Sequence, residues 1–161
     1  MDEQTEAFSK EGKYLTFSLG TEQYGLGILK IKEIIGMMPI TALPQAPDYL
    51  KGVINLRGKV IPIVDLRIKF AMPAQAETER TCIIVVEVAR HGTHCLTGLV
   101  VDAVSEVLNI KSEQIEEHSS LGDLHSESVL GLAKVESGVK ILLDIDRVIN
   151  NDISTAMQLA A

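Results

Sequence analysis

Two stretches of this sequence recur later in the chain, in the same order and at nearly the same spacing. Residues 25–35 (GLGILKIKEII) align without a gap with residues 98–108 (GLVVDAVSEVL), and residues 52–66 (GVINLRGKVIPIVDL) align with residues 131–145 (GLAKVESGVKILLDI). The aligned stretches share glycines, acidic residues and most apolar positions, and a single loop insertion accounts for the change in spacing. A collinear repeat of this kind predicts two copies of one structural unit.

The apolar pattern within each copy is typical of β-strands. Leu15, Phe17 and Leu19 occupy alternate positions, which is the period of a half-buried strand, and residues 24–28 are expected to pair with them. The sequence also predicts three hairpins: residues 53–56 with 59–64 around Arg57 and Gly58, 82–88 with 95–101 around His91 and Gly92, and 130–135 with 139–143 around Ser137 and Gly138. Because only 4% of the residues are aromatic, the core must be built from Ile, Val and Leu, which favours strands.

Short helices are predicted at three places. The spacing of Ile28, Ile31, Ile34 and Ile35 suits one or two helical turns better than a strand. Residues 47–52 are expected to form a single turn between a proline and a glycine, and Asp144 is expected to cap a helix that ends near residue 149.

Three further segments are expected to be irregular or to lie at an edge. Pro62 indicates that one side of its strand is unpaired, because proline has no backbone N–H to donate. Residues 71–80 are polar and without periodicity, which indicates a linker, and residues 111–128 form a long polar loop.

These elements predict one domain at residues 14–150, with a polar tail at 1–13 and a tail or helix at 151–161. Its two units are expected at residues 14–80 and 81–150, each with about five strands and a short helical turn, closed into a barrel or packed as a sandwich. A unit of about 65 residues buries little apolar surface alone, so the two units should share a hydrophobic interface.

Charge and hydropathy exclude several classes of protein. The formal net charge is -7 and no basic run is present, which argues against nucleic-acid binding. No uncharged apolar stretch approaches the roughly 18 residues that span a bilayer, so no direct membrane insertion is expected. The acidic, polar N-terminus does not resemble a secretory signal, and we therefore expect a cytoplasmic protein.

The sequence contains no organised catalytic or metal-binding motif, so we expect no enzyme activity, no metal and no cofactor. Residues 25–27 (GLG) begin like a dinucleotide fingerprint, but Lys30 replaces its third glycine. Three possible metal ligands flank a predicted turn without a fourth: His91, His94 and Cys95. One alternative is an enzyme or ligand sensor whose site lies at residues 118–128, where His and Ser side chains are concentrated.

Glu33 and Arg57 are charged residues within otherwise apolar or hairpin surroundings. An ion pair between them would satisfy both charges, and removal of either would be costly if the pair were buried. The alternative is that they are independent surface charges.

Residues 24–36 (YGLGILKIKEIIG) and 49–70 (YLKGVINLRGKVIPIVDLRIKF), together with residues 98–108, resemble the CheW family of chemotaxis coupling proteins. The similarity extends from about residue 14 to 150. It implies a mainly β fold of two intertwined five-stranded SH3-like β-barrels with short helices.

The resemblance also implies a function. It is that of a non-enzymatic adaptor between the regulatory domain of the histidine kinase CheA and the cytoplasmic tips of methyl-accepting chemoreceptors. Such an adaptor is recruited to receptor arrays at the inner face of the membrane. The alternative is an adaptor of the same fold in another receptor-kinase pathway, such as surface motility.

The resemblance assigns particular residues to two surfaces. The receptor-binding positions are Ile28, Glu33, Ile34, Arg57 and Ile83, and the kinase-binding positions are Ile31, Gly52, Glu116, Ser120 and Leu121. At two of these positions the chain departs from the family pattern, with Glu116 in place of a basic residue and Leu121 in place of an aromatic one.

Overall fold

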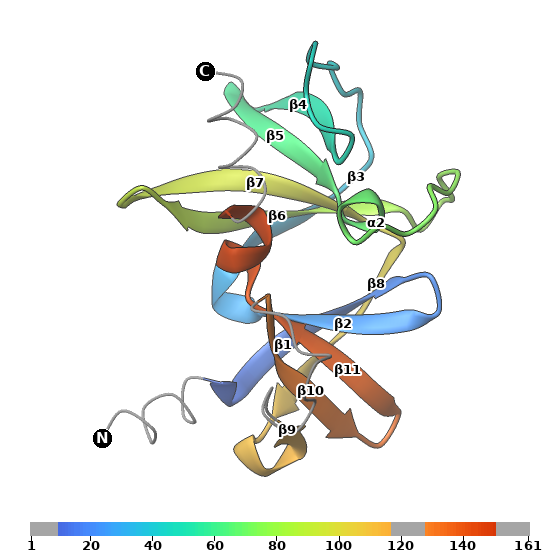
Figure 1. Ribbon diagram of the computed structural model, residues 1–161, viewed down its shortest axis with the longest axis vertical. Helices are drawn as coiled ribbons and strands as arrows, with labels where there is room; N and C mark the ends of the chain where they lie inside the picture. Colours follow the sequence, from blue (N-terminus) through green and yellow to red (C-terminus); the bar gives the residue numbers. More distant parts are fainter. Residues whose placement is uncertain (1–9, 117–127, 151–161) are drawn as a thin grey trace.

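The computed structural model describes residues 10–116 and 128–150, which form two β-sheets stacked along the long axis of the molecule (Figure 1). The six-stranded sheet has the order β8-β1-β2-β11-β10-β9 and the five-stranded sheet the order β3-β6-β7-β5-β4. The strands are β1 (Gly12–Leu19), β2 (Glu22–Gly27), β3 (Ile31–Gly36), β4 (Leu50–Leu56), β5 (Lys59–Asp65), β6 (Cys82–Arg90), β7 (Thr93–Val101), β8 (Ala103–Ile110), β9 (Ile115–Glu116), β10 (Val129–Val135) and β11 (Gly138–Leu143). Short helices occur at η1 (Ile28–Lys30), α2 (Leu66–Lys69), η2 (Ser112–Gln114) and residues 145–150.

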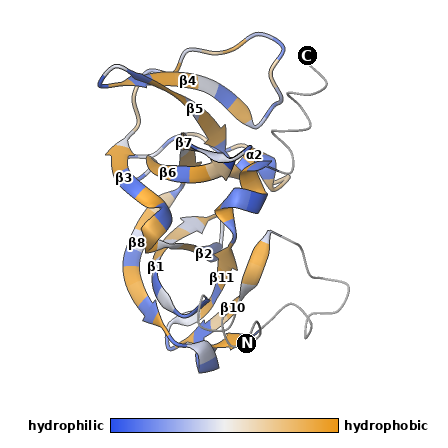
Figure 2. Cartoon of the chain, turned by 90° about the vertical axis from the view of Figure 1, so that its left-hand side faces the viewer, coloured by the Kyte–Doolittle hydropathy of each residue, from blue (hydrophilic) through white to orange (hydrophobic). Residues whose placement is uncertain are grey.

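Each sheet takes strands from both copies of the repeat. Hairpin β1–β2 of the first copy pairs with β8 and β11 of the second, and hairpin β6–β7 of the second copy pairs with β3 and β5 of the first. When each strand is replaced by its repeat counterpart, the order β8-β1-β2-β11-β10 becomes β3-β6-β7-β5-β4. The strands of the lower sheet in Figure 2 curve around into a barrel-like wall. The predicted mainly β, intertwined fold is therefore confirmed.

The predicted boundary near residue 80 separates the two repeats but does not separate the two sheets. The chain crosses from one sheet to the other twice, after β2 through η1 and after β7 at Asp102. A division into barrels at residues 14–80 and 81–150 is therefore wrong, because each barrel-like unit is assembled from both halves. The six-stranded sheet also contains β9, a strand of two residues that the sequence analysis did not predict.

All three predicted hairpins are present, as is the helix after Asp144, whose carboxylate accepts a hydrogen bond from the Arg147 N–H at 3.3 Å. The helix expected from residue 28 is wrong beyond Lys30, because residues 31–36 form strand β3 with alternating burial against β6. Residues 50–52 likewise begin β4 and not a helical turn. The sequence analysis also missed β8. Pro62 lies where β5 pairs with β4 alone, because pairing with β7 begins only at Ile63, so the predicted unpaired side is confirmed.

The predicted hydrophobic interface between the halves is the largest core cluster. It contains Phe17 and Leu26 of the six-stranded sheet together with Ile84 and Leu99 of the five-stranded sheet, all fully buried. Two smaller clusters fill the individual units, one around Ile54, Ile61 and Ile83 and the other around Tyr14, Ile110 and Leu142. Because apolar burial is the main driving force of folding, neither half is expected to be stable without the other.

Asp102, between β7 and β8, is held by Arg67 of α2. The guanidinium donates to both carboxylate oxygens, at 2.8 and 2.6 Å, and the Gly20 N–H donates at 2.7 Å. These donors, with the Arg67 side chain first, hold the pKa of Asp102 below its ordinary value of 3.8, although partial burial opposes them. The carboxylate is therefore stabilised more in the folded protein than in the unfolded chain.

We expect Asp102→Asn to lower the free energy of unfolding at pH 7 by about 1–2 kcal/mol, because charge-assisted hydrogen bonds are lost. Since the folded-state pKa is lowered, this stabilisation is present above the unfolded-state pKa and disappears as the pH falls through the folded-state value. Urea unfolding of both proteins at pH 7, 5 and 3 measures the difference. A difference that is as large at pH 3 as at pH 7 would contradict this assignment.

Candidate functional site

Arg57 lies at the tip of the β4–β5 hairpin and its guanidinium donates a hydrogen bond to the Glu33 carboxylate on β3. The turn is shaped by Arg57 itself, whose φ is 51°, and by the Asn55 side chain, which accepts a hydrogen bond from the Gly58 N–H at 2.8 Å. The ion pair, one of the two alternatives that the sequence left open, is therefore present. The side chains are 69% exposed for Arg57 and 33% exposed for Glu33, so this is a surface ion pair and contributes at most about 1 kcal/mol to stability.

The pair lies at one end of a cleft of about 590 Å³ between β3, the β4–β5 hairpin and the β6–β7 hairpin. Apolar side chains of Ile61, Val85 and Leu96 line it together with charged residues of both signs. On its β6 side, the Glu87 carboxylate lies 3.6 Å from the Lys32 ammonium and 3.8 Å from the His94 ring. A cleft with an apolar floor and a charged rim suits a protein segment better than a reaction.

The other predicted receptor positions fall in different surroundings. Ile34 is 44% exposed on β3, but its side chain projects to the opposite face of this edge strand from Glu33, because side chains alternate along a strand. Ile28 is half-buried in η1 and packs against the main core. Ile83 is fully buried, so its prediction as a receptor contact is wrong: its side chain fills the core of the five-stranded sheet.

Sequence reasoning also missed Leu29, whose side chain is 93% exposed in η1. The sequence pattern gave no signal of its exposure. A leucine within an apolar run that is expected to be helical is usually assigned to the core, whereas the short η1 crossover turns this side chain outward.

The predicted kinase positions do not form one surface. Gly52 is buried in β4 of the five-stranded sheet, and Ile31 is half-buried against the main core. Glu116 is exposed on β9, an edge of the six-stranded sheet, where it pairs with Lys134 at 2.5 Å. Figure 1 shows β4 and β9 at opposite ends of the molecule. Ser120 and Leu121 lie outside the described residues.

Gly52 has a structural reason to be glycine. Its φ is 146°, and a Cβ at this position would lie 2.0 Å from the backbone carbonyl oxygen of Thr41. Thr41 forms a short backbone bridge with Val53 at this point, with two hydrogen bonds of 2.9 Å. The close approach of Thr41 therefore fixes the loop between β3 and β4 against the edge of the sheet.

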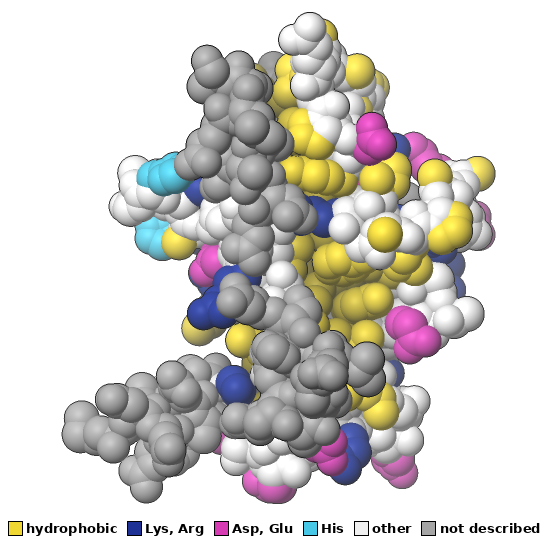
Figure 3. All heavy atoms as spheres, viewed as in Figure 1, with side chains coloured by type: hydrophobic (Ala, Val, Ile, Leu, Met, Phe, Trp, Pro, Cys, Tyr) yellow, Lys and Arg dark blue, Asp and Glu magenta, His cyan; other side chains and the backbone are white. Residues whose placement is uncertain are grey.

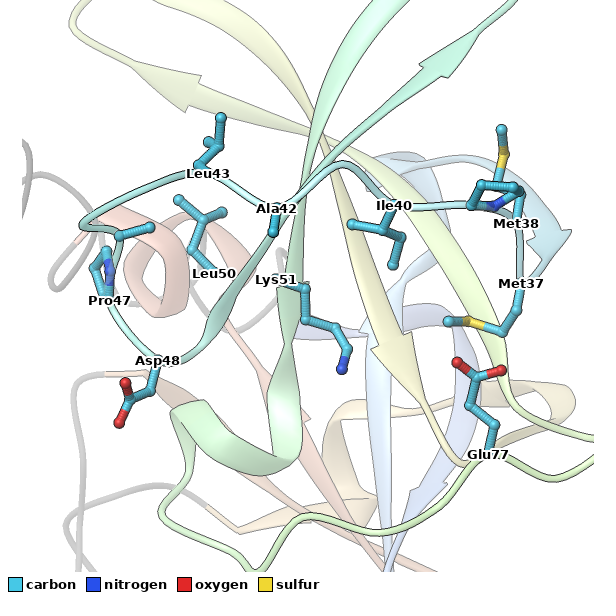
Figure 4. A pocket seen from close by; sticks show the side chains of 12 residues that line it. Met37, Met38, Ile40, Ala42, Leu43, Pro47, Asp48, Leu50, Lys51 and Glu77 are labelled. Atoms are coloured by element: carbon cyan, nitrogen blue, oxygen red, sulfur yellow. The ribbon is translucent and has the colours of Figure 1, made fainter.

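That loop encloses a second hollow, of about 780 Å³, which sequence reasoning did not predict (Figure 4). Leu50 and Lys51 of β4 lie beneath it, and its other labelled side chains come mainly from the loop: Met37, Met38, Ile40, Ala42, Leu43, Pro47 and Asp48. Figure 3 shows hydrophobic side chains gathered in the middle of one face of the molecule.

The described residues contain no group of three His, Cys, Asp or Glu side chains that is arranged to hold a metal ion. The alternative site at residues 118–128 falls almost entirely outside the described residues. Among residues 10–116 and 128–150, no helix is long and apolar enough to cross a membrane.

Comparison with known proteins places this geometry in a family. The family model of the CheW-like domain matches residues 13–152. The chain is 38% identical to the chemotaxis protein CheW of Klebsiella aerogenes over 87% of this chain and 82% of that protein. It is 34% identical to a probable chemotaxis protein CheW of Rhizobium etli, over 88% and 90% of the two chains. A crystal structure of the scaffolding protein TtCheW from Thermoanaerobacter tengcongensis superposes with a TM-score of 0.76 at 34% identity, covering 86% of this chain and 92% of that one. The chain therefore belongs to the CheW family of chemotaxis scaffolding proteins.

Proposed function

We propose that this protein is a non-enzymatic adaptor that couples the cytoplasmic tips of methyl-accepting chemoreceptors to the regulatory domain of the histidine kinase CheA. The observation that carries the proposal is the position of two surface hollows beside one strand. β4 passes the buried Gly52 near its start, beside the hollow under the β3–β4 loop, and ends at Leu56, next to Arg57 in the cleft. A rigid strand that borders both surfaces is suited to hold two partners at once.

The cleft around Glu33 and Arg57 supports the receptor side of the proposal. Receptor tips are helical, and a helix can lay its apolar face on partly exposed side chains such as Leu56 and Leu96 while its polar residues meet the charged rim. We assign the receptor surface to both faces of the edge strand β3, with Glu33 and Arg57 on one face and Ile34 on the other, and to the half-buried Ile28 in η1. Leu29 joins this set as an exposed apolar neighbour of Ile28.

The kinase side is assigned to the surface over Gly52. Gly52 itself is buried, so a partner contacts the loop that Gly52 allows to approach, with Leu43 as its most exposed large apolar residue at 41%. Ile31 contributes to this surface indirectly, because its half-buried side chain packs β3 on the core. We assign Glu116, at the opposite end of the molecule, to a second contact with the kinase. Such a contact would permit larger assemblies.

Each contact can be modest in affinity, because linked weak contacts in an array give strong overall binding. The protein would then be held at receptor arrays on the inner face of the membrane by its partners. The net charge of -7 gives no support for nucleic acid as a partner.

A binding experiment with both partners tests the proposal. We expect the purified protein to retain the CheA regulatory domain and a receptor signalling fragment from the same organism, separately and together, in a pull-down assay. A characterised coupling protein run in parallel provides the control. Failure to bind either partner under conditions where the control binds both would refute the proposal. Selective capture of a receptor and kinase from a surface-motility pathway would favour the alternative adaptor role.

A further inference from the structure

Two ion pairs occupy equivalent places in the two copies of the repeat. Arg67 of α2 pairs with Asp102 between β7 and β8 at 2.6 Å, and Asp146 of the helix at 145–150 pairs with Lys30 at the end of η1 at 2.7 Å. In the sequence alignment of the repeats, Arg67 and Asp146 are equivalent, and Asp102 aligns with Leu29, the neighbour of Lys30. Each pair therefore joins a terminal helix of one half to the strand crossover of the other half.

Both carboxylates also accept a hydrogen bond from the backbone of a hairpin. The Gly20 N–H donates to Asp102 at 2.7 Å, and the Ala89 N–H donates to Asp146 at 3.0 Å. Gly20 and Ala89 hold equivalent positions in hairpins β1–β2 and β6–β7. The two sites therefore match in that each contains one ion pair and one backbone N–H that donates to the carboxylate.

The polarity of the two pairs is reversed with respect to the fold. The terminal helix supplies the cation at one site and the carboxylate at the other. With respect to the chain, the arrangement is uniform, because both cations belong to the first half and both carboxylates belong to the second half.

This arrangement matters because strand order and pairing alone do not distinguish the halves. Their strands are equivalent in order and pairing, and the hydrophobic effect is non-directional. If two first halves from different chains paired in the same way, Arg67 would meet Lys30. If two second halves paired, Asp146 would meet Asp102, and like charges would face each other at both sites.

We infer that the reversed ion pairs make the interface between the halves selective, so that residues 12–70 accept residues 82–150 and reject a second copy of themselves. The inference does not depend on the proposed function. Arg67 is only 11% exposed, so its unpaired charge would be costly in a mismatched assembly. Repulsion in the wrong assembly is a recognised means of specificity.

A charge exchange at one site tests this inference. The variant is the full chain with Lys30→Asp and Asp146→Lys, in which the ion pair within the chain is kept with reversed charges. If two first halves paired, however, Arg67 would now meet the carboxylate introduced at position 30. We expect the double variant to recover most of the melting temperature lost by Asp146→Lys alone. After refolding at high protein concentration, we expect dimers with paired first halves to increase about fivefold or more over the wild type. Cross-linking mass spectrometry on mixed isotope-labelled and unlabelled chains identifies these dimers.

Two further measurements keep the test decisive. The exchange Glu116→Lys with Lys134→Glu reverses an ion pair of similar length that lies within the second half, and it should leave the dimer fraction unchanged. Refolding the wild-type protein in about 1 M salt, where the screening length falls to about 3 Å, should raise the same dimers without any substitution. The inference is overturned if neither high salt nor a folded charge-exchange variant raises the fraction of dimers with paired first halves above that of the Glu116→Lys, Lys134→Glu control.

Discussion

Gly52→Val is expected to lower the free energy of unfolding by about 3 kcal/mol or more, because the side chain would be strained and would collide with Thr41. The φ of 146° is unfavourable for a β-branched residue, and the carbonyl oxygen 2.0 Å from the added Cβ belongs to the backbone and cannot rotate away. The β3–β4 loop would have to leave the sheet edge. Urea unfolding and the melting temperature measure the loss.

Gly36→Ala provides the control, because an added Cβ at that glycine meets nothing within 4 Å. Binding to the CheA regulatory domain distinguishes a structural role of Gly52 from a direct contact with the kinase. We expect Gly52→Val to lose affinity for the CheA regulatory domain as the loop is displaced, in parallel with its stability. A variant that keeps the wild-type melting temperature yet loses the kinase would show that our structural explanation of Gly52 is incorrect.

Arg57→Glu is expected to weaken receptor association about tenfold or more, equivalent to about 1.4 kcal/mol, and to leave kinase association nearly unchanged. The substitution places two carboxylates at the rim of the cleft in place of an ion pair. Because Arg57 is 69% exposed, the melting temperature should change little. Titration calorimetry with a receptor signalling fragment and with the CheA regulatory domain measures both affinities.

Two variants sharpen this result. Arg147→Glu changes another exposed arginine that pairs with a single carboxylate, that of Asp144 at 3.5 Å, and should not alter receptor binding. Glu33→Arg combined with Arg57→Glu restores an ion pair with reversed charges. If the receptor contacts these two charges directly, the double variant should still bind the receptor weakly. Equal loss of receptor and kinase binding together with a lower melting temperature would instead assign Arg57 to maintenance of the fold.

The candidate site was only partly predictable from the sequence. The charges of Glu33 and Arg57 and the tight turn at Arg57 and Gly58 could be recognised, but the sequence left open whether the two residues pair, because they lie 24 positions apart. Ile83 was misassigned because both faces of β6 are buried, with Ile84 in the main core and Ile83 in the core of the five-stranded sheet, and the short apolar run from 82 to 88 does not show that. The hollow beneath the β3–β4 loop escaped prediction because it depends on how an irregular loop lies against β4, with Glu77 of the linker beside it.

The sequence by itself determined the repeated unit, its hairpins and the apolar faces of its strands, because alternation and turn chemistry act over a few neighbouring residues. Tertiary structure alone decided that residues 31–36 extend as an edge strand, since pairing with β6 outweighs a helical spacing of isoleucines. It also decided that each hairpin pairs with strands of the other half. The two halves have equivalent strand orders, so this pairing depends on contacts between residues far apart in the chain, such as Arg67 with Asp102.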